Sequence, residues 1–156
     1  MYRALLAATA IGALTLASLP SPLGAQKPRD LKKLDACKLL TTADVEAAAK
    51  GKQFTPQVGG EVHCGYALQL PDKKVEQYDF YLSEPNITVE LWKAFPTKKG
   101  TAVPGLWDEA YVGPSEGTPS QLSLVALHRG DMSIELQGPR KDVLIVLAKV
   151  AIARLK

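Results

Sequence analysis

This 156-residue chain is poor in the side chains from which catalytic and metal centres are built. It has two cysteines, two histidines, two methionines and two tryptophans. The histidines, His63 and His128, lie far apart in the sequence, and neither belongs to a close ligand pair such as His-x-x-x-His. Nucleophile elbows, phosphate-binding loops, dinucleotide fingerprints and calcium loops are all missing from the sequence. The sequence therefore predicts no catalytic residue and no cofactor.

The chain also lacks a strong charge of one sign. Its formal net charge is +3, and Lys and Arg are scattered apart from one cluster at residues 27–33. A nucleic-acid-binding protein presents a basic face or stripe. We therefore expect no nucleic-acid partner, and we interpret the basic cluster as a solvated segment.

The first 25 residues have the pattern of an export signal. Arg3 is followed by about 16 uncharged, mostly apolar residues, and small residues precede Ala25. A bilayer span needs roughly 20 such residues, so we expect cleavage near Ala25 and no stable membrane anchor afterwards. This predicts a periplasmic or secreted protein with a flexible basic linker at 26–34 and a single domain at 35–156.

The two cysteines, Cys37 and Cys64, would form one disulfide in an exported chain. The bridge closes a loop of about 28 residues, which the chain-entropy treatment values at roughly 3.5 kcal/mol. His63 directly precedes Cys64, an order that raises the question of a nucleophile with its base. Adjacent residues in a strand point to opposite faces, however, so a disulfide is favoured over a cysteine nucleophile.

Alternation and helical periodicity predict one α+β domain, an antiparallel sheet of about five to six strands packed by N- and C-terminal helices. Thr41 and Asp44 have the spacing of a capping box. The predicted strands are 62–70, 75–82, 108–112, 121–127 and 132–137, and the predicted helices are 42–50, 83–96 and 140–156, with a half-turn at 36–40.

Several motifs together resemble those of known proteins. In order along the chain they are CKLLTTADVEAAAKG, CGYAL, VPGLWDEAYV, LHRGDMSIEL and a terminal apolar helix. This order resembles families of small secreted proteins and lipoproteins of bacteria whose function is unknown. The chain departs from the pattern at Trp107, which replaces the second glycine of a Gly-Leu-Gly motif, and it has no lipid-attachment cysteine. The resemblance implies a helix-covered antiparallel sheet with Cys37 linked to Cys64, and it implies no activity.

The best candidate for a ligand-contacting surface is formed by Trp107, Glu109 and Tyr111. The three residues share one face of the strand predicted at 108–112, beside a loop rich in Gly and Pro. Aromatic rings with a polar group suit recognition of a small molecule or a peptide. The alternative is that Trp107 and Tyr111 only pack on the sheet or under the terminal helix.

Three functions stay open. The favoured one is a non-enzymatic exported domain that binds a small ligand or a protein partner in the bacterial periplasm or outside the cell. The second is a metal-handling protein or an enzyme, in which His63 and His128 would converge if their strands were neighbours. The third is a structural envelope subunit that associates through its C-terminal helix, whose apolar residues extend beyond one face.

Overall fold

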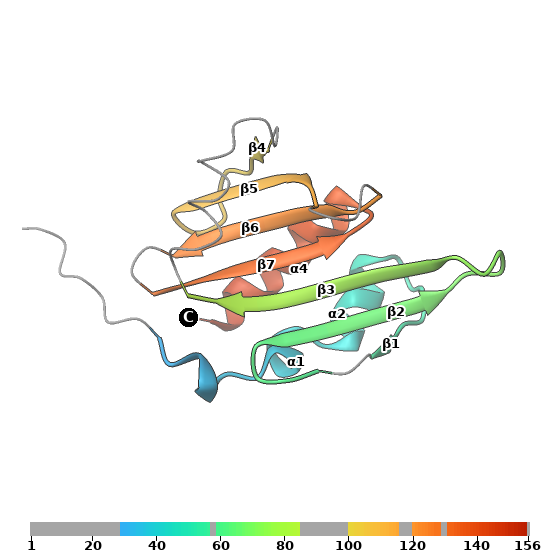
Figure 1. The fold of residues 1–156 in the computed structure, drawn as a ribbon, viewed down its shortest axis with the longest axis horizontal. Coiled ribbons are helices and arrows are strands. Elements are labelled where there is room, and N and C mark those ends of the chain that lie inside the picture. Colours follow the sequence, from blue (N-terminus) through green and yellow to red (C-terminus); the bar gives the residue numbers. More distant parts are fainter. Residues whose placement is uncertain (1–28, 57–58, 85–99, 116–119, 129–130, 156) are drawn as a thin grey trace, which may run out of the picture.

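In the part of the chain that the structure describes, seven antiparallel strands form one open sheet in the order β1-β2-β3-β7-β6-β5-β4 (Figure 1). The computed structural model describes residues 29–56, 59–84, 100–115, 120–128 and 131–155. The α-helices within these ranges lie on one face of the sheet (Figure 1). The five long strands are β2 (His63–Gln69), β3 (Val75–Ser83), β5 (Glu109–Pro114), β6 (Leu122–His128) and β7 (Met132–Gly138).

The fold confirms the predicted α+β class, but the sheet has seven strands instead of five or six. The two additional strands are β1 (Thr55–Pro56) and β4 (Thr101–Ala102), one at each edge of the sheet. Each has two residues, which is too short for an alternation of apolar and polar side chains to be seen. Edge strands this short also limit pairing with other chains.

Both predicted hairpins are present, and their pairing with each other builds the centre of the sheet. β2 pairs with β3 and β6 pairs with β7, each antiparallel. β3 and β7 then pair along five positions, from Asp79 opposite Gln137 to Ser83 opposite Ser133. At the β2–β3 turn Lys73 takes a positive φ of 63°, and its N–H donates to the carbonyl of Leu70.

Three helices follow from local caps and apolar patterning. α1 (Ala36–Leu39) begins at Asp35, whose carboxylate accepts from the backbone N–H groups of Cys37 and Lys38. α2 (Thr42–Ala48) begins with the predicted capping box of Thr41 and Asp44. α4 (Lys141–Arg154) is the predicted C-terminal helix.

The core lies between the sheet and these helices. α4 contributes five buried residues, and the side chains of Tyr66, Tyr78, Phe80 and Leu136 meet the helices from the sheet. The Tyr66 hydroxyl is buried and donates to the carbonyl of Leu40, between α1 and α2. The main core is on this side of the sheet, and a smaller buried cluster of Val125 and Leu127 lies on the other face under Tyr111.

Some expectations for the N-terminal part differ from the structure. Residues 1–25, the predicted signal, lie outside the described residues. Within the predicted flexible linker, Leu31–Lys33 form a 3₁₀ helix, and Arg29 pairs with Asp131 at 2.9 Å. The described part of this segment is therefore attached to the domain, because an ion pair and partly buried leucines fix it there.

Two further expectations concern strand ends. The strand predicted at 62–70 begins one residue later, at His63, and Val62 is 41% exposed. Ser83, the first residue of the helix predicted at 83–96, is the last residue of β3, and residues 85–96 lie outside the described ranges. None of the helices within the described residues has the length and apolar character that a membrane span requires.

Candidate functional site

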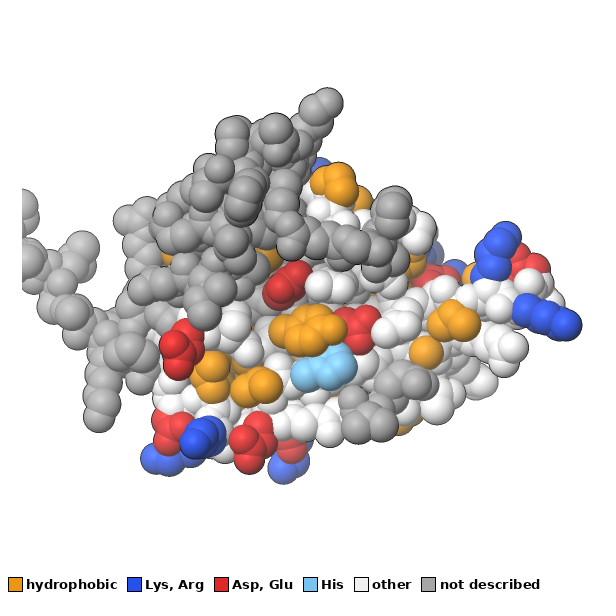
Figure 2. Space-filling view, in the orientation of Figure 1, with side chains coloured by type: hydrophobic (Ala, Val, Ile, Leu, Met, Phe, Trp, Pro, Cys, Tyr) orange, Lys and Arg blue, Asp and Glu red, His pale blue; other side chains and the backbone are white. Residues whose placement is uncertain are grey.

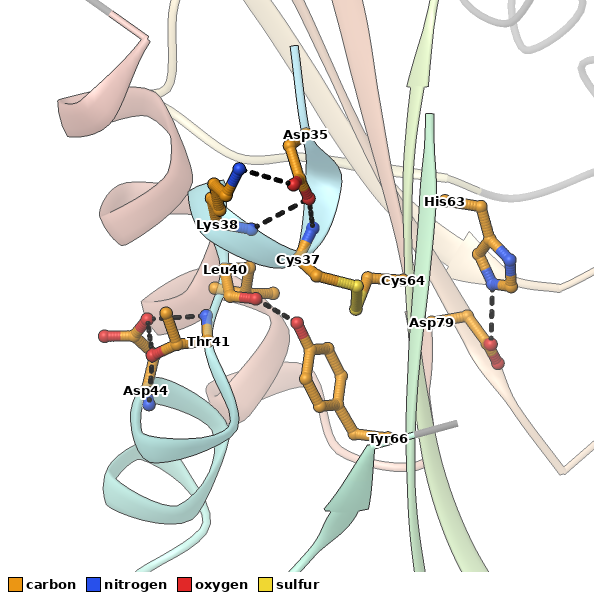
Figure 3. The surroundings of a disulfide bond; sticks show 10 residues. All are labelled: Asp35, Cys37, Lys38, Leu40, Thr41, Asp44, His63, Cys64, Tyr66 and Asp79. Atoms are coloured by element: carbon orange, nitrogen blue, oxygen red, sulfur yellow. Dashed lines mark hydrogen bonds and ion pairs between the residues drawn. A yellow bond between two sulfur atoms is a disulfide. The ribbon is translucent and has the colours of Figure 1, made fainter. Parts of the chain in front are cut away.

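The predicted disulfide between Cys37 and Cys64 is present and joins α1 to β2, with 5.2 Å between the Cα atoms. His63 lies on the other side of the sheet, where it contacts Asp79 (Figure 3). Both cysteines of the chain are used in the bridge, which removes a free thiol as a nucleophile. A disulfide fits an oxidising compartment outside the cytoplasm.

The structure does not bring the two histidines together. His63 is on β2 and His128 ends β6, with β3 and β7 between these strands. His128 lies opposite Met132 of the core, and its ring meets that of Trp107 edge-on at 5.6 Å. His128 is thus on the helix-covered side, whereas His63 is on the opposite side. Among the described residues no group of three metal-ligating side chains occurs.

The predicted trio on β5 is partly kept together. The Tyr111 hydroxyl donates to the Glu109 carboxylate at 3.4 Å, and the Tyr111 ring packs on Val125 and Leu127. Trp107 precedes β5 in a left-handed conformation with φ of 46°, and it packs against the main core. All three residues border a surface hollow of about 400 Å³ formed by residues 102–111. Glu109 and Tyr111 are therefore joined by a hydrogen bond, while the Trp107 ring packs mainly against the core.

The C-terminal helix offers little surface for association. Its buried residues pack against the sheet, and Ile145, Val150 and Ile152 also contact the core. Val146, 46% exposed, is the one exposed large hydrophobic residue on α4. The apolar residues beyond one face of the helix are explained mostly by burial, because the helix packs deep against the sheet.

A second group of polar and aromatic side chains lies on the open face, the face of the sheet without a described helix. Strand register places five residues in one row across β2, β3, β7, β6 and β5. The row is His63, Tyr81, Glu135, Val125 and Tyr111. The adjacent row contains Asp79, Gln137 and Ser123. The pairing of β3 with β7 thus places Asp79 beside Gln137, although the two residues are 58 positions apart in the sequence.

His63 is held on this face by two contacts. Its Nε2 lies 3.1 Å from Asp79 Oδ1, and its ring stacks on Tyr81 with 4.4 Å between centroids and 10° between planes. Gln77 donates to the other carboxylate oxygen of Asp79 at 2.8 Å. The Asp79 side chain is 9% exposed and that of His63 is 37% exposed. When neutral, His63 donates from Nε2 to Asp79, which leaves Nδ1 as a hydrogen-bond acceptor.

Glu135 is the second carboxylate at the centre of the open face. Its Oε1 accepts from Ser123 Oγ at 2.6 Å and from Gln137 Nε2 at 2.9 Å. Burial raises the pKa of Tyr81, and the negative charges of Asp79 and Glu135 raise it further. The Tyr81 phenol therefore lies within the field of both carboxylates.

Within the described residues the open face is acidic, although the chain as a whole is basic. At the outward positions of the five long strands the ionisable residues are His63, Asp79, Tyr81, Glu135, Glu109 and Tyr111, with no Lys or Arg. In the part of this face that Figure 2 shows in colour, a histidine lies beside hydrophobic and acidic side chains. The Lys and Arg side chains visible in this view lie toward the rims (Figure 2).

Sequence reasoning placed His63 outward but missed its neighbours. The alternation in 75–82 puts Asp79 and Tyr81 on the polar side of β3. That signal could have identified both residues as outward-facing. It could not show that Glu135 lies beside Tyr81, because β3 and β7 belong to different hairpins.

No protein-family model, curated protein or solved structure matches this chain. The resemblance to small exported bacterial proteins therefore stays a prediction. Function has to be inferred from the side chains of the open face and from the disulfide.

Proposed function

We propose that this protein is an exported, non-enzymatic binding domain whose binding surface is the open face of the sheet. The observation that carries the proposal is the row of His63, Tyr81 and Glu135 across the neighbouring strands β2, β3 and β7. Tyrosine rings with a polar end are favoured at binding surfaces, because they supply contact area and a hydrogen bond with few rotatable bonds.

The side chains of the open face are already ordered. Asp79 is held by His63 and Gln77, and Glu135 by Ser123 and Gln137. Side chains fixed in this way lose less conformational entropy when a partner binds. The core of the protein does not require these hydrogen bonds on the open face. Their presence therefore supports a role of this face in recognition.

Export is supported by two independent features. The N-terminal residues have the pattern of a cleavable signal, and the disulfide fits an oxidising compartment. We therefore propose that the protein acts in the bacterial periplasm or outside the cell. Its partner is a small ligand or another protein.

The proposal is tested by nuclear magnetic resonance of the ¹⁵N-labelled protein without residues 1–25. A panel of amino acids, sugars, nucleosides and short peptides is titrated, and amide shifts are mapped on the structure. We expect saturable shifts in β2, β3 and β7 that Tyr81→Ala abolishes. Val146→Ala on α4 is the control that leaves them unchanged. Shifts only at the helices or at the β4–β5 hollow, or no saturable shift, contradict the proposal.

One observation favours the enzyme alternative as a second candidate. An imidazole oriented by a buried carboxylate is the arrangement of a general base, and His63 with Asp79 has it. The assay is turnover of a panel of ester, amide and phosphodiester substrates. Activity that is lost in both His63→Gln and Asp79→Asn would establish this alternative, and absence of turnover in the unaltered protein would leave binding as the function.

A further inference from the structure

The charges of the open face are unevenly compensated. Asp79 is buried, and among the described residues its ion-pair partner is His63, whose imidazole is charged only when protonated. Glu135 is half-buried, and within the described residues its donors are neutral and it makes no ion pair. Moving a carboxylate out of water costs free energy that a nearby cation recovers. A positively charged partner would supply that cation.

The aromatic side chain between these carboxylates, Tyr81, favours one kind of cation over another. Tyr81 is half-buried, with His63 stacked on its ring and both carboxylates acting on its phenol. A guanidinium group stacks on aromatic rings and donates two parallel hydrogen bonds to a carboxylate, whereas an ammonium group is a compact, strongly hydrated charge. Tyr81 beside Glu135 therefore suits arginine better than lysine.

The arrangement of the carboxylates indicates a peptide segment instead of a small molecule. His63, Tyr81 and Glu135 form a row across three neighbouring strands, roughly 10 Å at the usual inter-strand spacing. Beyond Glu135 the row reaches Val125, which is buried. The two carboxylates lie on different strands, Asp79 on β3 and Glu135 on β7. Charges spread over two strands match a partner that is long enough to span them.

We propose that the open face binds an arginine-bearing segment of a protein partner, with one guanidinium group over Tyr81 and against Glu135. This inference rests on the proposed binding function and specifies its partner. The net charge of +3 for the whole chain makes the acidic face a local feature and not a consequence of composition. Electrostatic complementarity of this kind sets partner choice and association rate.

The test is a binding titration by fluorescence polarisation of a labelled peptide, Gly-Arg-Gly-Arg-Gly, at low salt. The same peptide with citrulline in place of arginine keeps the shape and removes the charge, and a lysine version keeps only the charge. We expect the arginine peptide to bind at least ten-fold tighter than the citrulline peptide and several-fold tighter than the lysine peptide. Equal affinities for arginine and citrulline overturn the proposal.

Matched variants locate the contact. Glu135→Gln keeps an acceptor for Ser123 and Gln137 while removing the charge, and we expect it to weaken binding at least five-fold, as should Tyr81→Leu. Asp142→Asn removes one charge from α4, on the helix side of the sheet, and should leave affinity unchanged. Circular dichroism checks that each variant is folded. An equal loss in Asp142→Asn and Glu135→Gln would show unspecific charge attraction and would overturn the proposal.

Two further outcomes separate the inferences. If free arginine amide binds as tightly as the peptide, the partner is a small organic cation and not a protein segment. If the arginine peptide fails while another compound shifts the open-face amides, only the arginine assignment is wrong. If no compound shifts these amides, the arginine assignment and the proposed function are both wrong.

Discussion

Gly59 passes so close to the disulfide that a methyl group at this position has no room. A Cβ added to Gly59 would lie 2.2 Å from the Sγ of Cys37 and 3.3 Å from the Sγ of Cys64. The φ of Gly59 is outside the left-handed region, so an alanine there suffers from this contact and not from backbone strain. Glycine is needed here because the backbone covers the sulfur atoms directly.

The cost of Gly59→Ala should therefore depend on whether the sulfur atoms are present. Overpacking of this kind costs about 1–3 kcal/mol, and we expect the free energy of unfolding to fall by about 2 kcal/mol in the disulfide-bonded protein. In a Cys37→Ala/Cys64→Ala background the clashing atoms are gone. There Gly59→Ala should be neutral or stabilise by about 0.4–1 kcal/mol, because alanine restricts the unfolded chain.

The assay is equilibrium urea unfolding of the four proteins of this double-mutant cycle. Gly60→Ala is the control, since a Cβ added to Gly60 meets nothing within 4 Å. The reasoning is refuted if Gly59→Ala costs the same with and without the cysteines. It is also refuted if Gly60→Ala costs as much as Gly59→Ala.

Three further predictions concern stability. Replacing Cys37 and Cys64 together should lower the free energy of unfolding by about 3.5 kcal/mol in urea, and a loss below about 1 kcal/mol would contradict the loop-entropy account. Arg154 holds the pKa of Asp44 at about 2, below its usual 3.8. Because the folded-state pKa is the lower one, this pair contributes above pH 4, and its contribution is lost as pH falls toward 2. We expect this partly exposed pair to contribute about 1 kcal/mol to the free energy of unfolding. In Arg154→Met the free energy of unfolding should therefore vary less between pH 2 and 4. An unchanged pH profile would show that the pair contributes nothing. Tyr66→Phe should cost about 1 kcal/mol in thermal or urea unfolding, because it leaves a buried carbonyl without its donor; a stabilised variant would argue against that hydrogen bond.

Local patterns in the sequence determine most of the secondary structure. The capping box of Thr41 and Asp44 starts α2 where expected, and alternation predicts the long strands to within a few residues. These features depend on neighbours within four positions along the chain, so they are readable without the fold. The two-residue edge strands carry no such pattern, and they were missed.

The candidate site could be predicted from the sequence only in part. Alternation was enough to separate His63 from Cys64, since adjacent strand residues point to opposite faces. The distance between His63 and His128 could not be known, because it depends on which strands are neighbours and on which face each side chain lies. The structure places them on opposite faces with two strands between them.

The sequence by itself determined the α+β class, the disulfide partners and the outward position of His63, because each follows from local periodicity or from there being two cysteines. Only the tertiary structure decided that Tyr81 lies beside Glu135. That neighbourhood comes from the pairing of β3 with β7, which joins two separate hairpins. Such pairing depends on how the hairpins bury their common face against the helices, and no spacing along the chain encodes it.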